Sequence, residues 1–160
     1  MSATRIVFPP LTSRGDLLLM LGELSRVDLE IWARCRELSE EQLNDPVIPG
    51  TWPMLRILAH LAATEAYALA CIEQRPNAVP RPAESEGPYE REAVLTDVDE
   101  ARAATLSFVK SRPEAVLVEE CQYGEVGEQT VGGVLYHLIE HVIHHRAFLR
   151  LKMAQWESQP

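Results

Sequence analysis

The C-terminal part of the chain carries the pattern that most restricts its fold. Across residues 131–156, apolar residues recur at spacings of three and four, the period of one face of an α-helix. The ladder consists of Val131, Leu135, Leu138, Val142, Leu149, Met153 and Trp156. A histidine, His145, takes one step of this ladder. A helix of this length needs partners to cover its apolar face, and the pattern predicts an all-α fold.

Three further stretches have helical periodicity. We expect helices over residues 13–38, 53–74 and 96–112, in addition to one over residues 130–156. Ser13 and Thr96 or Asp97 are suitable N-caps, and the fixed φ of Pro53 suits a first helical turn. The second of these helices is apolar almost all round and should be the most buried.

The connections are of two kinds. Residues 76–93 contain four prolines and several charges, which indicates a long loop. Residues 115–131 are compatible with a short strand or with an extended connection and a turn. The pattern predicts one domain over residues 1–160, a four-helix up-and-down bundle with a possible crossover at the Pro-rich loop.

Composition excludes several classes of function. The 160 residues include 46% apolar and 24% charged residues, and the formal net charge of −9 argues against nucleic-acid binding. The three cysteines form no CxxC pair, which indicates a reducing compartment, and we expect the cytoplasm. The N-terminus has no hydrophobic signal core, and no stretch looks long and uncharged enough to span a membrane. We therefore expect neither a nucleic-acid nor a membrane partner.

Three histidines form the strongest candidate site. His141 and His145 are four residues apart, so along a helix they are about 400° and roughly 6 Å apart and face nearly the same side. His60 lies in the apolar helix over residues 53–74. Three imidazoles from two helices can hold one metal ion and leave a coordination position open for reaction. His137 is a plausible neighbour, and His144 should face solvent.

A packed, metal-free role is the alternative for these histidines, because a buried imidazole also satisfies itself with hydrogen bonds. Two carboxylates, Asp28 and Glu65, fall on the apolar faces of their helices and also need partners. Each can pair with an arginine such as Arg56 or Arg146, or accept a hydrogen bond from a ligating imidazole or relay a proton. We favour the ion pair. Cys71 is expected in the core.

Two segments resemble the DinB-like superfamily, which includes the YfiT-type proteins. The run from Thr51 to Leu61 resembles the family's Trp-x-x-x-x-[IL]-x-x-His helix start, and the run from His141 to Arg146 resembles its H-x-x-x-H-R segment. The order and separation of the two segments also fit. The family commonly continues H-R-G-Q, whereas this chain has Ala147 and Phe148, and Phe148 removes a polar group from the substrate surroundings.

The resemblance implies a four-helix bundle and a divalent metal, nickel or zinc, held by His60, His141 and His145. Members of the family often form homodimers, so the resemblance also implies a homodimer for this chain. Some members are S-transferases that use a low-molecular-weight thiol. Further members resemble isomerases or hydrolases.

Three hypotheses of function follow. In the first, a metal-dependent S-transferase activates a small thiol, with His137 or Glu65 as a candidate proton acceptor and Trp52, Tyr67 and Tyr123 as candidate pocket residues. The same site would make a hydrolase if it activated water. In the second, the bundle binds metal without catalysis. In the third, it is a structural or partner-binding protein without metal.

Overall fold

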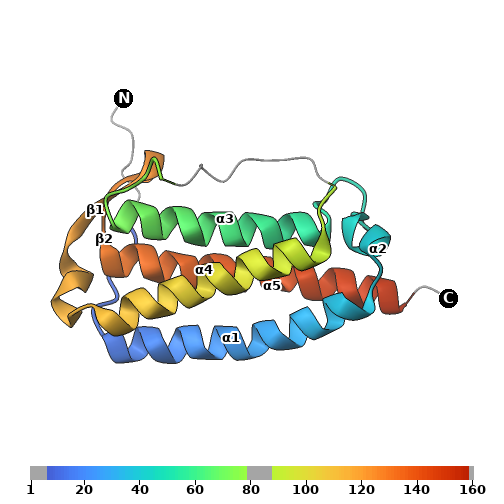
Figure 1. Cartoon of the computed structure of the whole chain (residues 1–160), viewed down its shortest axis with the longest axis horizontal. Helices are drawn as coiled ribbons and strands as arrows, with labels where there is room; N and C mark the ends of the chain where they lie inside the picture. Colours follow the sequence, from blue (N-terminus) through green and yellow to red (C-terminus); the bar gives the residue numbers. More distant parts are fainter. Residues whose placement is uncertain (1–6, 79–87, 159–160) are drawn as a thin grey trace.

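Four long helices form the body of the protein in a computed structural model, which describes residues 7–78 and 88–158 (Figure 1). They are α1 (Arg14–Glu37), α3 (Met54–Ile72), α4 (Arg91–Ser111) and α5 (Val131–Glu157). A short helix, α2 (Glu40–Asn44), lies between α1 and α3. Two 3-10 turns, η1 (Glu114–Val118) and η2 (Gly124–Val126), and two strands, β1 (Glu120–Tyr123) and β2 (Gly127–Thr130), lie between α4 and α5. The predicted four-helix bundle is confirmed.

The helices run in two parallel pairs. An ion pair between Arg34 and Glu157 joins the C-terminal ends of α1 and α5. Ile72 and Phe108, near the C-terminal ends of α3 and α4, line one cavity, so these two helices run the same way, opposite to α1 and α5 (Figure 1). The directions therefore do not alternate strictly, and the chain crosses over between α3 and α4, as allowed for at the Pro-rich loop.

Side-chain caps mark the helix starts that the sequence predicted well. Ser13 accepts a hydrogen bond from Asp16 N at 3.2 Å at the start of α1, and Thr130 accepts one from Gly133 N at 3.1 Å at the start of α5. Both hydroxyls satisfy an N–H that the first helical turn leaves free.

The predicted start of α4 is wrong, because the helix begins five residues earlier, at Arg91. Its N-cap, Glu90, makes no side-chain capping bond and gives no sequence signal. Thr96, taken as a cap, instead donates from Oγ1 to the carbonyl of Glu92 at 2.8 Å inside the helix. The expected loop over residues 76–93 is therefore too long at its C-terminal end, and its residues 79–87 lie outside the described part of the chain.

Two small elements complete the connections. The helix α2 begins at a capping box in which Ser39 and Gln42 exchange hydrogen bonds of 3.1 and 2.9 Å. The strands β1 and β2 form an antiparallel hairpin with Cys121 opposite Gln129. Of the two structures considered for residues 115–131, the short strand is correct, and the segment forms two strands, not one.

The most buried of the helices is α3, as predicted. By length and composition it is also long and apolar enough to cross a membrane, with a mean hydropathy of 1.4 over its best window. The expectation that no stretch would qualify was therefore wrong. In the bundle, 67% of that window is buried against protein, as in the core helix of a globular domain.

The N-terminal segment, residues 7–12, lies against the first turn of α5. Phe8 N donates to Oε1 of Gln129 at 2.9 Å. A Cβ atom built on Gly132 would lie 1.9 Å from the carbonyl oxygen of Leu11, so only glycine fits at this position. The close approach places Phe8 beside residues of α5 that matter for the site.

Candidate metal centre

The three predicted ligands converge at one point between α3 and α5, which pack against each other. Nε2 of His141 lies 3.2 Å from Nε2 of His60 and 3.1 Å from Nε2 of His145. One ligand nitrogen from each histidine lies within 4.8 Å of the other two. The half-buried rings have centroids 4.5 to 5.2 Å apart. The structure therefore brings together His60, His141 and His145 as the sequence predicted.

The donor set fits a divalent ion. A Zn–N bond length of about 2.0–2.1 Å and a tetrahedral angle place two ligand nitrogens about 3.3–3.4 Å apart. The two shortest separations here, 3.1 and 3.2 Å, are close to that value. Imidazole suits zinc, nickel, copper and iron alike, so the ligands favour this class of metal without choosing within it. Three ligands from the chain leave room for a water or substrate ligand.

The electrostatics keep the ligands neutral, as metal binding requires. Burial lowers the pKa of His141 to about 3, with repulsion from His145 and His60 adding to the effect. Burial likewise lowers the pKa of His145 to about 4, with His60 and His144 contributing. At neutral pH the lone pairs of these imidazoles are therefore available for coordination.

The indole ring of Trp52 packs against two of the three histidines. The Trp52 ring is stacked on His145 with centroids 6.4 Å apart and meets His60 edge-on at 5.2 Å. The guanidinium of Arg56 lies 4.5 Å above the Trp52 ring. Trp52, expected to line a pocket, does lie at the site. His144 is exposed, as predicted.

A second aromatic group surrounds His137, one turn before His141. Phe8 is stacked on His137 with centroids 4.2 Å apart, and Tyr123 meets the same ring at 6.1 Å. Tyr67 lies next to Tyr123. The His137 and His141 centroids are 5.9 Å apart. Burial lowers the pKa of His137 and Glu140 opposes this shift, so the ring is uncharged at neutral pH.

The two buried carboxylates lie in a separate cluster. Arg102 donates to both oxygens of Glu65, at 2.9 and 3.2 Å, and to Oδ2 of Asp28 at 3.2 Å. Arg146 donates to Oδ1 of Asp28 at 2.7 Å. The expected pairing with arginine is confirmed, although Glu65 takes Arg102 and neither Arg56 nor Arg146. Because both of its oxygens are engaged, Glu65 is a poorer candidate proton acceptor than His137.

The cysteines of the chain are buried and form no disulfide. Burial raises the pKa of Cys35 and of Cys121 to about 11, so both stay protonated at neutral pH. Cys71 lies in the core, as expected. A thiolate nucleophile at the site would have to come from another molecule.

A cavity of about 270 Å³ opens beside the metal centre. It is lined by Gly50, Thr51, Trp52, Ile57, His145, Phe148 and Lys152. Lys152 was not among the site residues predicted from the sequence. Its position, three residues after Leu149 and seven after His145, places it on the apolar face of the helix and could have revealed it.

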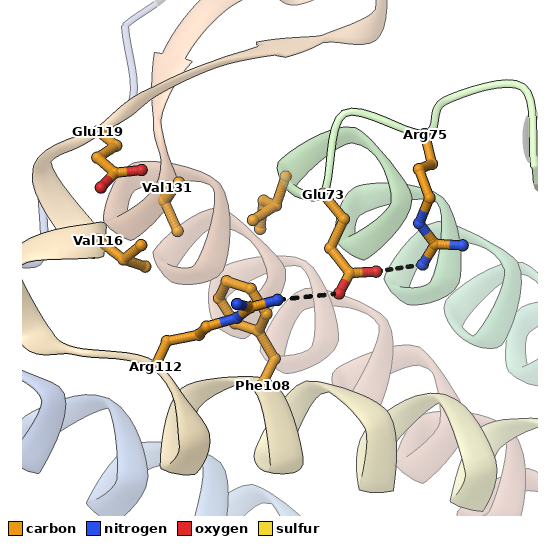
Figure 2. Close-up of a pocket in the computed structure, with 8 residues that line it drawn as sticks. Glu73, Arg75, Phe108, Arg112, Val116, Glu119 and Val131 are labelled. Atoms are coloured by element: carbon orange, nitrogen blue, oxygen red, sulfur yellow. Dashed lines mark hydrogen bonds and ion pairs between the residues drawn. The ribbon is translucent and has the colours of Figure 1, made fainter.

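Another cavity, of about 310 Å³, lies at the C-terminal ends of α3 and α4. Figure 2 shows Glu73 between two arginines, with Arg112 at 3.8 Å and Arg75 paired to the other carboxylate oxygen. Arg112 also lies over the Phe108 ring. Both arginines that line this cavity are thus paired with the carboxylate of Glu73. None of the predicted site residues lines the cavity.

Comparisons with known proteins agree with the fold. The family model of the DinB superfamily matches residues 23–149, which include all three histidines. Among solved structures, the crystal structure of TT2238, a four-helix bundle protein, superposes with a TM-score of 0.65. It covers 87% of this chain and 99% of that chain at 23% identity, which supports the fold alone. A comparison with curated proteins gives no match.

Proposed function

The chain belongs to the DinB superfamily, and from this premise we propose that it is a divalent-metal-dependent S-transferase that uses a low-molecular-weight thiol. The observation that carries the proposal is the convergence of three imidazoles, with ligand nitrogens within 4.8 Å of one another. Nickel or zinc would be held by His60, His141 and His145, and the position left open would receive the thiol.

The chemistry divides between the ion and the chain. A bound divalent ion lowers the pKa of a thiol and so supplies a thiolate at neutral pH. The chain fixes the three imidazoles on two packed helices, and Trp52 shields one side of them from water. In the overall reaction the thiol loses its proton, its sulfur forms a bond to an electrophilic carbon, and the leaving group departs with the electrons of its bond.

His137 is the proposed acceptor of the thiol proton. Its ring lies 5.9 Å from that of His141, and Phe8 holds it in a fixed stacked orientation. Burial favours its neutral form. The buried cysteines support an external thiol as the nucleophile, because Cys35 and Cys121 remain protonated.

Elemental analysis of protein purified without a histidine tag tests the metal site. We expect about one divalent ion per chain, lost in His145→Ala and kept in His144→Ala, which changes an exposed neighbour. Absence of metal after dialysis against zinc and against nickel would overturn the proposal.

A turnover assay tests the reaction. Metal-loaded protein, a small thiol and a model electrophile should give S-alkylated product faster than the same mixture with His145→Ala. No rate above background would overturn the transferase. In that case, hydrolysis of an ester by the same preparation would make the protein a hydrolase, and inactivity in both assays would leave a metal-binding bundle.

A further inference from the structure

The cavity beside the three histidines is bounded by three parts of the chain, of which α3 supplies Ile57. The connection before α3 supplies Gly50, Thr51 and Trp52, and α5 supplies His145, Phe148 and Lys152. Its volume of about 270 Å³ is just below the range of about 300–1,000 Å³ typical of small-molecule sites. A ligand that fits here is small.

The buried Lys152 is the one charged residue among those that line this cavity. Lys152 is 1% exposed, and its ammonium donates to the carbonyl of Pro46 and to Oγ1 of Thr51, both at 2.6 Å. Among residues 7–78 and 88–158, no carboxylate forms an ion pair with this ammonium within 4.0 Å, and the charge of Asp45 acts on it from farther away. A lysine ammonium has three N–H donors, so one remains for a further partner. A buried charge of this kind is stabilised by an anion beside it.

The three residues that α5 supplies lie on one face of the helix. Lys152 follows His145 by seven residues, which is nearly two turns and about 10 Å along the axis. Phe148 lies between them on the same side. With Trp52 and Ile57 opposite, the space between the metal ligand and the ammonium is bordered by apolar side chains.

The geometry points to a small apolar carboxylic acid as the substrate of this site. We propose that its carboxylate binds the Lys152 ammonium, its hydrocarbon part fills the space between Trp52, Ile57 and Phe148, and its reactive end lies at His145. This inference rests on the proposed function for the reaction, but the binding of the acid does not require the metal.

Binding is measured by calorimetry on metal-free protein, so that the carboxylate has no ion to bind. The probes are 4-phenylbutyrate and its neutral counterpart 4-phenylbutanamide, which have the same length and ring. A hydrogen bond to a charged group contributes enough that we expect the acid to bind about tenfold or more tightly than the amide. Equal binding of the two probes, or no binding of either, would overturn the inference.

Two variants assign the preference to Lys152. We expect Lys152→Met to abolish the preference for the acid while keeping the amide affinity. If this variant loses the fold of the connection before α3, Phe148→Glu decides: Phe148 is 41% exposed, both probes lose its contact, and the new carboxylate would in addition repel the acid, so the preference for the acid should fall. A preference for the acid that survives Phe148→Glu unchanged would overturn the inference.

The outcomes keep the two proposals apart. Metal bound by the histidines together with equal binding of acid and amide would refute only the carboxylate site. A preference for the acid in a protein that binds no metal would refute only the metal-dependent reaction.

Discussion

Two groups of polar side chains lie in the same bundle and resolve their burial in opposite ways. The ion-pair cluster consists of Asp28, Glu65, Arg102 and Arg146, with two positive and two negative charges held by hydrogen bonds of 2.7 to 3.2 Å. The histidine cluster consists of His60, His141 and His145. In it, burial lowers the pKa of His141 and of His145, so these two imidazoles are uncharged at neutral pH.

The difference separates structure from chemistry. In the ion-pair cluster each charged group already has a partner in the chain, so the cluster has little to offer a ligand. In the histidine cluster three ligand nitrogens lie close together, and a bound metal ion would supply a positive charge for their lone pairs. A buried polar group therefore indicates a site when its partners are missing from the chain, and a structural role when they are present.

The largest effect should come from breaking the ion-pair cluster. Replacing Arg102 with methionine leaves the buried Glu65 without its arginine partner and Asp28 with Arg146 alone, and we expect the free energy of unfolding to fall by about 3–5 kcal/mol. Urea denaturation measures it. The control is Arg26→Met, which removes an arginine that is 61% exposed and should cost less than about 1 kcal/mol. Similar small losses of unfolding free energy in both variants would show that Arg102 does not stabilise the two buried carboxylates.

Added metal should stabilise the folded protein by binding to the histidine cluster. At a zinc concentration about 100-fold above the dissociation constant, binding to the folded state raises the free energy of unfolding by about 2.7 kcal/mol. We expect this gain in the native protein and in Arg26→Met, and its loss in His141→Ala, because His141 lies within 3.2 Å of both other ligands. A gain that persists in His141→Ala would place the metal elsewhere.

Acid should destabilise the metal-free protein through the histidines. Burial lowers the pKa of His141 to about 3 and of His145 to about 4 in the folded state, against 6.5 for an ordinary histidine. Below pH 6.5 the unfolded chain therefore binds more protons, and stability falls as the pH falls toward 4. The slope is at most about 1.4 kcal/mol per pH unit for each histidine.

Urea denaturation between pH 7 and pH 5 measures this slope. The double variant His141→Phe/His145→Phe should show a flatter profile than the native protein over the same range. A slope as steep in the variant would assign the acid sensitivity to other groups.

The smallest effect should come from the exposed histidine next to the site. His144→Ala is expected to change the free energy of unfolding by no more than about 0.5 kcal/mol and to leave the bound metal unchanged. Parallel denaturation and elemental analysis with His145→Ala provide the comparison. Loss of metal in His144→Ala would mean that His144 is itself needed for metal binding, contrary to the predicted set of three ligands.

The parts of the fold that sequence predicts are those fixed by local periodicity and caps. α1 and α5 begin where Ser13 and Thr130 cap them, and the HxxxH spacing places His141 and His145 on one face. The start of α4 was missed because Glu90 makes no capping bond. The capping box of Ser39 at the start of α2 is a sequence signal from which this short helix could have been predicted.

The parts that sequence does not predict depend on contacts between distant residues. Arg102 is 37 residues from Glu65 and 74 from Asp28, and nothing in the local pattern selects it as their partner. Lys152 is bonded to oxygens of a connection about 100 residues earlier. Pairings of this kind follow from how the helices pack, which periodicity leaves open.

The close approach at Gly132 has a practical consequence for anyone who wishes to redesign this protein. Any residue larger than glycine at position 132 would collide with the Leu11 carbonyl oxygen, so this position cannot be varied without moving the backbone. Attempts to reshape the surroundings of His137 should therefore begin at Phe8, a half-buried side chain on the N-terminal segment, whose replacement leaves α5 as it is.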